Sequence, residues 1–206
     1  MEESEAIARC QRGDISGLAY LIPLYELQAV RVAYLIVGDR AQAEDVVQDA
    51  FLSAYEHIHQ FDPRRAFGPW FLQSVVHRAL RTATRDARTQ PWTGKLEAIY
   101  QQFPSGNSDP IQHILTAEVK TTLWNTVSRL PADQRAAVVL RYYLDFSEAE
   151  MAAYLACPPG TVKSRLAAAR RRLRQWLPTW THTSDEPLPP IHVAARTQPG
   201  PEKELP

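Results

Sequence analysis

The chain has 206 residues, enough for one domain or two small ones. Its 23 basic and 23 acidic side chains cancel, so a strongly charged surface has to be a local feature rather than a property of the whole protein. No apolar run approaches the roughly 18 residues that cross a bilayer, and the acidic N-terminus lacks the basic and apolar regions of a signal peptide. These features argue against an integral membrane protein.

The two cysteines, Cys10 and Cys157, lie far apart in the sequence, and no metal-site spacing surrounds them. They leave two alternatives open, a disulfide or two reduced thiols. Disulfides are rare in the cytoplasm, and we favour two buried, reduced thiols in a cytoplasmic protein.

The first strongly patterned segment is the apolar stretch 18–37, in which Arg31 is the only basic residue. Pro23 interrupts this stretch early, and Gly38-Asp39-Arg40 supplies helix-stop and turn chemistry at its end. We therefore expect one helix before Pro23 and a second helix from about Leu24.

Segment 43–59 has the pattern of an amphipathic helix. Apolar residues recur at i, i+4, i+7 and i+11, the other face is acidic, and no Lys or Arg occurs between 41 and 63. Taken alone, the pattern favours a solvated outer face. The apolar positions are Val47, Phe51, Ala54 and Ile58, and the polar positions are Glu44, Asp45, Gln48, Asp49 and Glu56.

After a turn at Phe61-Asp62-Pro63, the sign of the charge inverts, and arginines dominate 64–88. Aromatic residues beside arginine at a helix entrance can stack on unpaired bases while the cations hold the backbone. For Trp70 and Phe71 we favour the alternative, a core position at helical spacing. Phe67 and Arg64 lie in the expected turn and are the better candidates for exposure.

Composition divides the chain into four parts. Segment 89–110 loses helical periodicity and gathers Gln, Pro, Gly, Ser and Asn, which predicts a linker between the modules 1–88 and 111–178. Segment 179–206 is dense in Pro and is predicted to be disordered.

The second module is predicted to hold short helices that end in a basic one. A helix is expected to open at Pro131, and Ser147 has capping-box spacing to Glu150 for a helix over 148–155. A turn at 157–160 then leads to a last helix, for which Thr161 is the expected cap. Its expected buried stripe is Val162, Leu166, Ala169, Leu173 and Leu177.

The last helix carries basic residues and no acidic residue between 161 and 177. Charge of one sign implies an outside partner of opposite sign, and duplex DNA fits because neutralised phosphates release condensed counterions. Two helices, a short turn containing Gly and a basic second helix fit a helix-turn-helix. That geometry places Lys163, Ser164 and Arg165 near base edges. The later arginines, suited to phosphates, are Arg170, Arg171, Arg172 and Arg174.

Two sets of motifs give the chain a family resemblance. GTVKSRL at 160–166, Ala169-Arg170-Arg171 after it, and Leu130-Pro131 with Gln134-Arg135 before it resemble region 4 of extracytoplasmic-function (ECF) sigma factors of the sigma-70 family. AEDVVQDAF at 43–51, with Gly38-Asp39 before it and Phe61-Asp62-Pro63 and Trp70 after it, resembles region 2.

The resemblance implies an all-α fold of two small helical domains joined by a flexible linker, and a promoter-specificity subunit that needs no cofactor. It implies that region 2 binds the clamp coiled coil of the largest RNA polymerase subunit and the −10 element, and that region 4 binds the −35 element and the flap. An anti-sigma factor is a further candidate partner. The residues it assigns are Asp45, Gln48, Asp49 and Leu52 to core polymerase, Arg64, Phe67, Trp70, His77, Arg78 and Arg81 to the −10 element, and Thr161, Lys163, Ser164, Arg165 and Arg170 to the −35 element.

The chain departs from the family pattern at three places, one of which is Gly68-Pro69 before Trp70, a pair that would alter how that helix begins. His77 stands where an Asn is frequent near the −10 strand, and Ala167-Ala168 replace residues that are often polar or basic. The main alternative function is a stand-alone helix-turn-helix regulator, which has no use for the acidic helix at 43–59. A pure interaction module leaves the basic helix unexplained, and no nucleophile–base pair, phosphate loop or metal cluster in the sequence indicates an enzyme.

Overall fold

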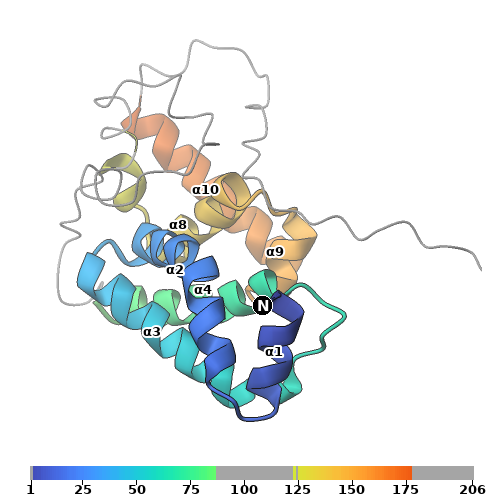
Figure 1. Cartoon of the computed structure of the whole chain (residues 1–206). Coiled ribbons are helices and arrows are strands. Elements are labelled where there is room, and N and C mark those ends of the chain that lie inside the picture. Colours follow the sequence, from blue (N-terminus) through green and yellow to red (C-terminus); the bar gives the residue numbers. More distant parts are fainter. Residues whose placement is uncertain (1, 87–122, 124, 178–206) are drawn as a thin grey trace, which may run out of the picture.

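The computed structural model describes residues 2–86, 123 and 125–177 (Figure 1). Within these ranges every regular element is a helix and no strand forms, which confirms the all-α fold class. The predicted linker and tail lie outside the described residues. The elements in chain order are α1 (Glu3–Gln11), α2 (Ser16–Val37), α3 (Arg40–His57), η1 (Ile58–Gln60), α4 (Phe67–Asp86), α8 (Ala132–Val138), η2 (Val139–Tyr143), α9 (Glu148–Tyr154) and α10 (Pro159–Trp176).

Helix α2 is continuous through Pro23, so the predicted break at this proline is wrong. Proline removes one backbone hydrogen bond from a helix, but burial on both sides of it holds the helix together. Leu21 lies before the proline, Ala29 and Val32 lie after it, and all three are buried. Gly38, in the left-handed conformation at φ 89°, ends the helix as expected.

Helix α2 is also long and apolar enough, by length and composition, to cross a membrane, contrary to the expectation from the sequence. Half of its apolar window is buried inside the protein, and the helix packs against α1, α3 and α4. This is the environment of a core helix. The close approach of α1, an element that the sequence pattern did not predict, requires Gly17, because a Cβ there would lie 2.2 Å from the carbonyl oxygen of Ala6.

Helix α3 follows the predicted pattern. Asp39 caps its N-terminus by accepting a 2.9 Å hydrogen bond from the backbone N–H of Gln42. All four positions of the predicted apolar stripe are buried, and the fourth, Ile58, belongs to η1 because α3 ends at His57.

Helix α4 begins at Phe67, and the prediction that this residue is exposed is wrong. Phe67 is 1 % exposed, and its ring lies 5.3 Å from that of Tyr25 and 5.6 Å from that of Phe61. The helix starts one turn earlier than Trp70, so Phe67 belongs to its buried face. Phe71 is buried as predicted, and Trp70 is half-buried.

The helix-turn-helix consists of α9 and α10. The capping box is confirmed, since Ser147 accepts from the N–H of Glu150 while the Glu150 carboxylate accepts from the N–H of Ser147. The expected cap at Thr161 is wrong, because α10 begins at Pro159 with Pro158 as its N-cap. In the predicted stripe of α10, Val162, Leu166 and Ala169 are buried, while Leu173 and Leu177 are half-buried.

One hydrophobic cluster extends from α1 to α10, so the two halves of the chain share buried side chains. Arg135 of α8 is 6 % exposed at this junction, and its Nε donates a 2.8 Å hydrogen bond to the carbonyl oxygen of Ile36 near the end of α2. Burial lowers the pKa of Arg135 to about 10. Of the two cysteines, Cys10 is buried, Cys157 is half-buried, and both are free thiols.

Candidate functional site

The outer face of α3 presents acidic side chains next to an exposed leucine. Asp45, Gln48, Asp49 and Leu52 are all exposed, and their i, i+3, i+4, i+7 spacing puts them on one side of the helix. Leu52 is 58 % exposed and lies at the C-terminal end of this set, one turn before Glu56. Such a face suits a partner that offers cations around an apolar contact.

The acidic face of α3 borders the basic face of α4. Arg78 Nη1 lies 3.9 Å from Asp49 Oδ2, so the two predicted binding surfaces meet at this pair. The Asp49 side chain is 68 % exposed, and an exposed ion pair of this length contributes little stability. Both groups are therefore available to outside partners. Arg81, one turn further along α4, is exposed, as is Arg64 in the turn before the helix.

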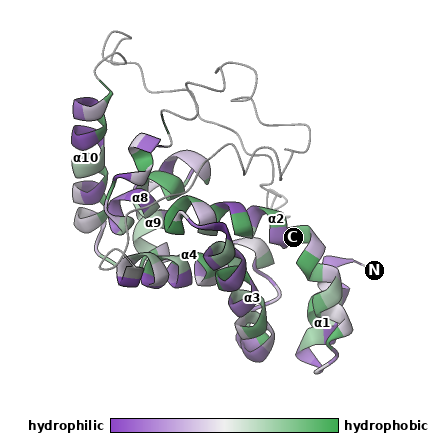
Figure 2. Cartoon of the chain, turned by 90° about the vertical axis from the view of Figure 1, so that its left-hand side faces the viewer, coloured by the Kyte–Doolittle hydropathy of each residue, from purple (hydrophilic) through white to green (hydrophobic). Residues whose placement is uncertain are grey.

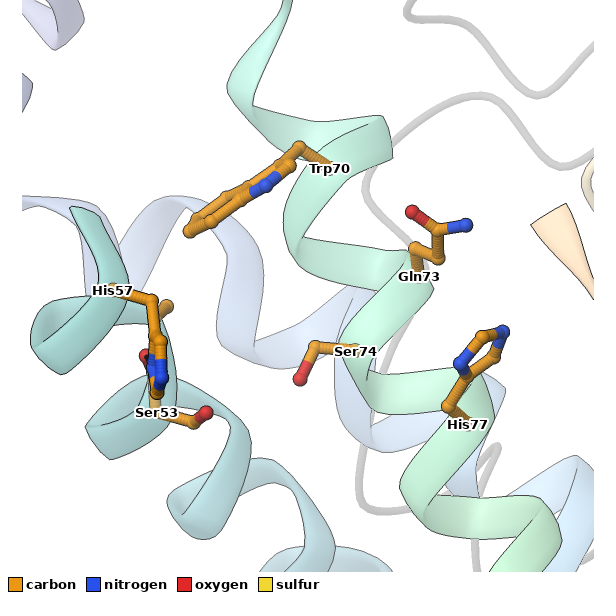
Figure 3. Close-up of a pocket in the computed structure, with 7 residues that line it drawn as sticks. Ser53, His57, Trp70, Gln73, Ser74 and His77 are labelled. Atoms are coloured by element: carbon orange, nitrogen blue, oxygen red, sulfur yellow. Dashed lines mark hydrogen bonds between the residues drawn. The ribbon is translucent and has the colours of Figure 1, made fainter. Parts of the chain in front are cut away.

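An open pocket of about 310 Å³ lies between α3 and α4 (Figure 3). The indole of Trp70 provides a flat apolar wall, and hydroxyl, amide and imidazole groups line the remainder. A flat aromatic surface surrounded by hydrogen-bonding groups suits an unpaired nucleobase. Sequence reasoning missed four of its polar residues, Ser53, His57, Gln73 and Ser74. The i, i+4 spacings of 53 and 57 on α3 and of 70 and 74 on α4 are visible in the sequence, but only the pairing of the helices brings them together.

His77 lies at the edge of this pocket, and its imidazole is hydrogen-bonded to a residue outside the pocket. Its Nε2 is 2.6 Å from the carbonyl oxygen of Tyr154 in α9. Because a carbonyl only accepts, this nitrogen carries the proton. Gln73 Nε2 donates to the same oxygen at 3.1 Å.

Helix α10 lies at the edge of the molecule, with hydrophilic residues along its length (Figure 2). Lys163, Arg170 and Arg174, at i, i+7 and i+11, are exposed on one face. None of these three has an acidic partner among the residues that the structure describes. This face can therefore neutralise phosphates directly.

Two arginines of α10 are turned toward α8 instead. Arg165, predicted to reach base edges, is half-buried, with its Nε 3.2 Å from Asp133 Oδ2. Arg172 Nη1 donates to Gln134 Oε1 at 2.9 Å. Of the remaining predicted contacts, Ser164 is exposed and Thr161 is half-buried. The Ser164 hydroxyl donates a hydrogen bond to the backbone carbonyl oxygen of Thr161.

In the described part of the chain, no three His, Cys, Asp or Glu side chains gather in a way that could hold a metal ion. The candidate surfaces for binding are the acidic face of α3, the pocket and cations of α4, and the cationic face of α10.

Comparison with known proteins gives matches to both halves. Residues 21–89 match the family model of sigma-70 region 2, and residues 120–173 match that of sigma-70 region 4. The ECF RNA polymerase sigma-E factor of Escherichia coli is 31% identical over 81% of this chain and 90% of its own. The RNA polymerase sigma-H factor of Pseudomonas aeruginosa is 28% identical over 84% of this chain and 92% of its own. The ECF RNA polymerase sigma factor SigW of Bacillus subtilis is 27% identical over 83% of this chain and 94% of its own.

Two solved structures share the fold. CnrH, solved in complex with the cytosolic domain of CnrY, has a TM-score of 0.57 at 20% identity and covers 87% of this chain and 99% of its own. The sigma factor RpoE of Bartonella quintana, solved in complex with the anti-sigma factor NepR, has a TM-score of 0.56 at 23% identity and covers 78% of this chain and 96% of its own.

Proposed function

The chain belongs to the ECF sigma factors of the sigma-70 family, and we propose that α3 holds RNA polymerase core while α4 and α10 hold the promoter. A sigma factor binds RNA polymerase and DNA in transcription initiation, and is not itself an enzyme. Its place of action is the cytoplasm, with the polymerase.

The acidic face of α3 is the proposed contact with the clamp coiled coil of the largest polymerase subunit. Asp45, Gln48 and Asp49 supply charge and hydrogen bonds, and Leu52, one turn further along α3, supplies an apolar contact. An exposed apolar side chain beside charged groups can be buried in a protein interface while the charges set its polar rim. The exposure and shared side of these residues are the observation that carries the proposal.

The pocket beside Trp70 is the proposed site for an unpaired base of the −10 element. Arg64, Arg78 and Arg81 lie around α4, where they can hold the strand's phosphates. Phe67 is buried and is not proposed to contact DNA. Its ring packs at the start of α4 and so helps to position Trp70 in the first turn of that helix.

The cationic face of α10 is the proposed −35 contact. Lys163 and Ser164 lie in the early turns, which enter the major groove in a helix-turn-helix, and Arg170 and Arg174 lie further along, toward the phosphates. Arg165 joins the base contacts only if it leaves Asp133.

Region 4 is also proposed to contact the polymerase flap. A protein that shares this fold was solved with an anti-sigma factor, and we propose a partner of that class for this chain.

Reconstitution with core polymerase tests the proposed function. Promoters selected from random DNA by the holoenzyme are expected to share two short motifs at fixed spacing, and the chain without polymerase is expected to select neither efficiently. Selection of one motif by the chain alone, with no effect of polymerase, would instead identify a stand-alone helix-turn-helix regulator.

A further inference from the structure

The pocket beside Trp70 is bounded by two helices that offer different groups to a ligand. Helix α4 contributes Trp70, Gln73 and Ser74 to the lining, and α3 contributes Ser53 and His57. Figure 3 shows Ser53 and His57 on the α3 side of the pocket, opposite the flank of α4 that carries Trp70 and Ser74. A base stacked on the face of the indole therefore turns one of its edges toward α3.

The hydrogen-bonding role of His57 is fixed by its own helix. Its Nδ1 lies 2.9 Å from the backbone carbonyl oxygen of Ser53, one turn earlier in α3. Because a carbonyl oxygen only accepts, Nδ1 carries the proton. In the neutral imidazole the other nitrogen, Nε2, then has a lone pair and no proton, so it accepts a hydrogen bond and donates none. This arrangement lies within α3 and depends on no other element.

The remaining polar groups of the pocket do not oppose this restriction. The hydroxyls of Ser53 and Ser74 rotate to donate or to accept, and the Gln73 amide has both donors and an acceptor. His77, at the edge of the pocket, has its Nε2 occupied by the carbonyl oxygen of Tyr154, so its other nitrogen is also an acceptor. The indole N–H lies in the plane of its ring and is not directed at a base stacked on the face of that ring.

The DNA bases differ in what they offer to such an acceptor. Adenine and cytosine carry an exocyclic amine at the position where thymine carries a carbonyl oxygen. An amine donates to the free nitrogen of His57. A thymine carbonyl facing the same nitrogen leaves two acceptors without a donor, which weakens binding where water is excluded.

We propose that His57 makes the pocket selective for a base with an exocyclic amine, adenine or cytosine, over thymine. The inference rests on the proposed function of the pocket and names the class of base that the pocket takes. His57 is then a specificity-determining residue for the −10 element, outside the set that the sequence predicts for that element.

The position of the bound base is located first. Holoenzyme is titrated with the selected promoter, prepared with an unpaired non-template strand across the −10 element and with one abasic site at a time. The base that enters the pocket is the one whose removal weakens binding by the wild type but not by Trp70→Ala.

Thymine and 5-methylcytosine at that position form a matched pair of ligands. They share the pyrimidine ring and the methyl group, and they differ in the carbonyl or amine at C4 and in the protonation of the adjacent ring nitrogen. Wild-type holoenzyme is expected to bind the 5-methylcytosine promoter about 5- to 10-fold more tightly, because only the amine satisfies the His57 acceptor. Equal binding of the two promoters, or tighter binding of the thymine promoter, would overturn the inference.

A substitution at His57 tests the residue itself. His57 is exposed, so its replacement leaves the core intact. The amide of His57→Gln turns either its oxygen or its NH₂ toward the base, and this variant is expected to bind the thymine promoter as tightly as the 5-methylcytosine promoter. His59→Gln makes the same change at an exposed histidine of η1, and this matched control is expected to keep the wild-type preference. An unchanged preference in His57→Gln would contradict the assigned role.

The proposed function and the base preference fail in different ways. If the wild-type chain does not start transcription with core polymerase, the proposed function fails. If it does, but no base of the −10 element depends on Trp70, the pocket assignment fails and the preference fails with it. If one base depends on Trp70 and the matched pair binds equally, only the preference fails.

Discussion

Arg165 shows how an internal partner changes the role of a single side chain. The sequence predicts a base contact for it beside Lys163 in the first turns of α10, yet its guanidinium lies 3.2 Å from Asp133 of α8. The ion pair is specific to the packing of α8 on α10, so nothing in the local sequence indicates it. In the proposed −35 contact, DNA would compete with Asp133 for this guanidinium.

This competition gives a prediction for two variants. Asp133→Asn is expected to tighten −35 binding, because it releases Arg165 without removing it. Arg165→Ala is expected to weaken binding to the selected −35 sequence by about 1–3 kcal/mol, as for a bidentate base contact. Fluorescence anisotropy with holoenzyme on matched and mutated −35 DNA measures both. An equal loss on every sequence would identify Arg165 as a phosphate contact, and a loss in Asp133→Asn would contradict the competition.

Phe67 and Trp70 are neighbouring aromatic residues whose replacement is expected to affect different properties, stability for Phe67 and strand binding for Trp70. Phe67→Ala is expected to lower the free energy of unfolding by about 3–5 kcal/mol, because it removes a buried ring from the start of α4. Trp70→Ala is expected to weaken binding of a −10 single strand by about 1–3 kcal/mol, the value for one stacked base. Urea unfolding and oligonucleotide titration measure the two effects. Loss of strand binding in a folded Phe67→Leu variant, with none in Trp70→Ala, would reverse these assignments.

At the scale of elements, strong periodicity gave reliable predictions. The i, i+4, i+7, i+11 pattern of α3 places its apolar side chains in the core, and Asp39 caps it as local chemistry predicts. Helix boundaries that depend on tertiary contacts were predicted less well. Helix α2 passes through Pro23, and α4 begins at Phe67, because buried contacts outweigh local preference at both places.

Pro23 is expected to cost α2 stability. It is exposed within the helix and leaves the carbonyl oxygen of Ala19 without its helical donor. Pro23→Ala restores that hydrogen bond and is expected to raise the free energy of unfolding by about 2 kcal/mol, after allowance for the greater freedom of the unfolded chain. Thermal unfolding followed by circular dichroism measures it, with Leu24→Ala at the adjacent exposed position as the control. A lower midpoint of thermal unfolding for Pro23→Ala than for the wild type would show that the proline ring is needed for packing.

At the scale of the whole molecule, the sequence predicts two modules and the structure joins them through a common cluster. The hydrogen bonds that α9 accepts from α4 run through the backbone carbonyls of Ala153 and Tyr154, which every residue type carries, so no motif indicates them. The departure at His77 has a structural counterpart, since this side chain donates to α9. The division into domains at 89–110 stays a prediction.

The acidic face of α3 distinguishes a sigma factor from a stand-alone DNA-binding regulator, so its affinity for core polymerase tests the account most directly. Asp49→Arg places a cation beside Arg78 and is expected to weaken core binding at least about tenfold, because like charges at a contact repel. Glu26→Arg, the same reversal on the exposed side of α2, is the matched control and is expected to bind like the wild type. The measurement is a titration of labelled chain with core polymerase. Nanomolar binding by the wild type, lost in Asp49→Arg alone, is the predicted result, and no binding by the wild type, or equal binding by all three proteins, would contradict the account.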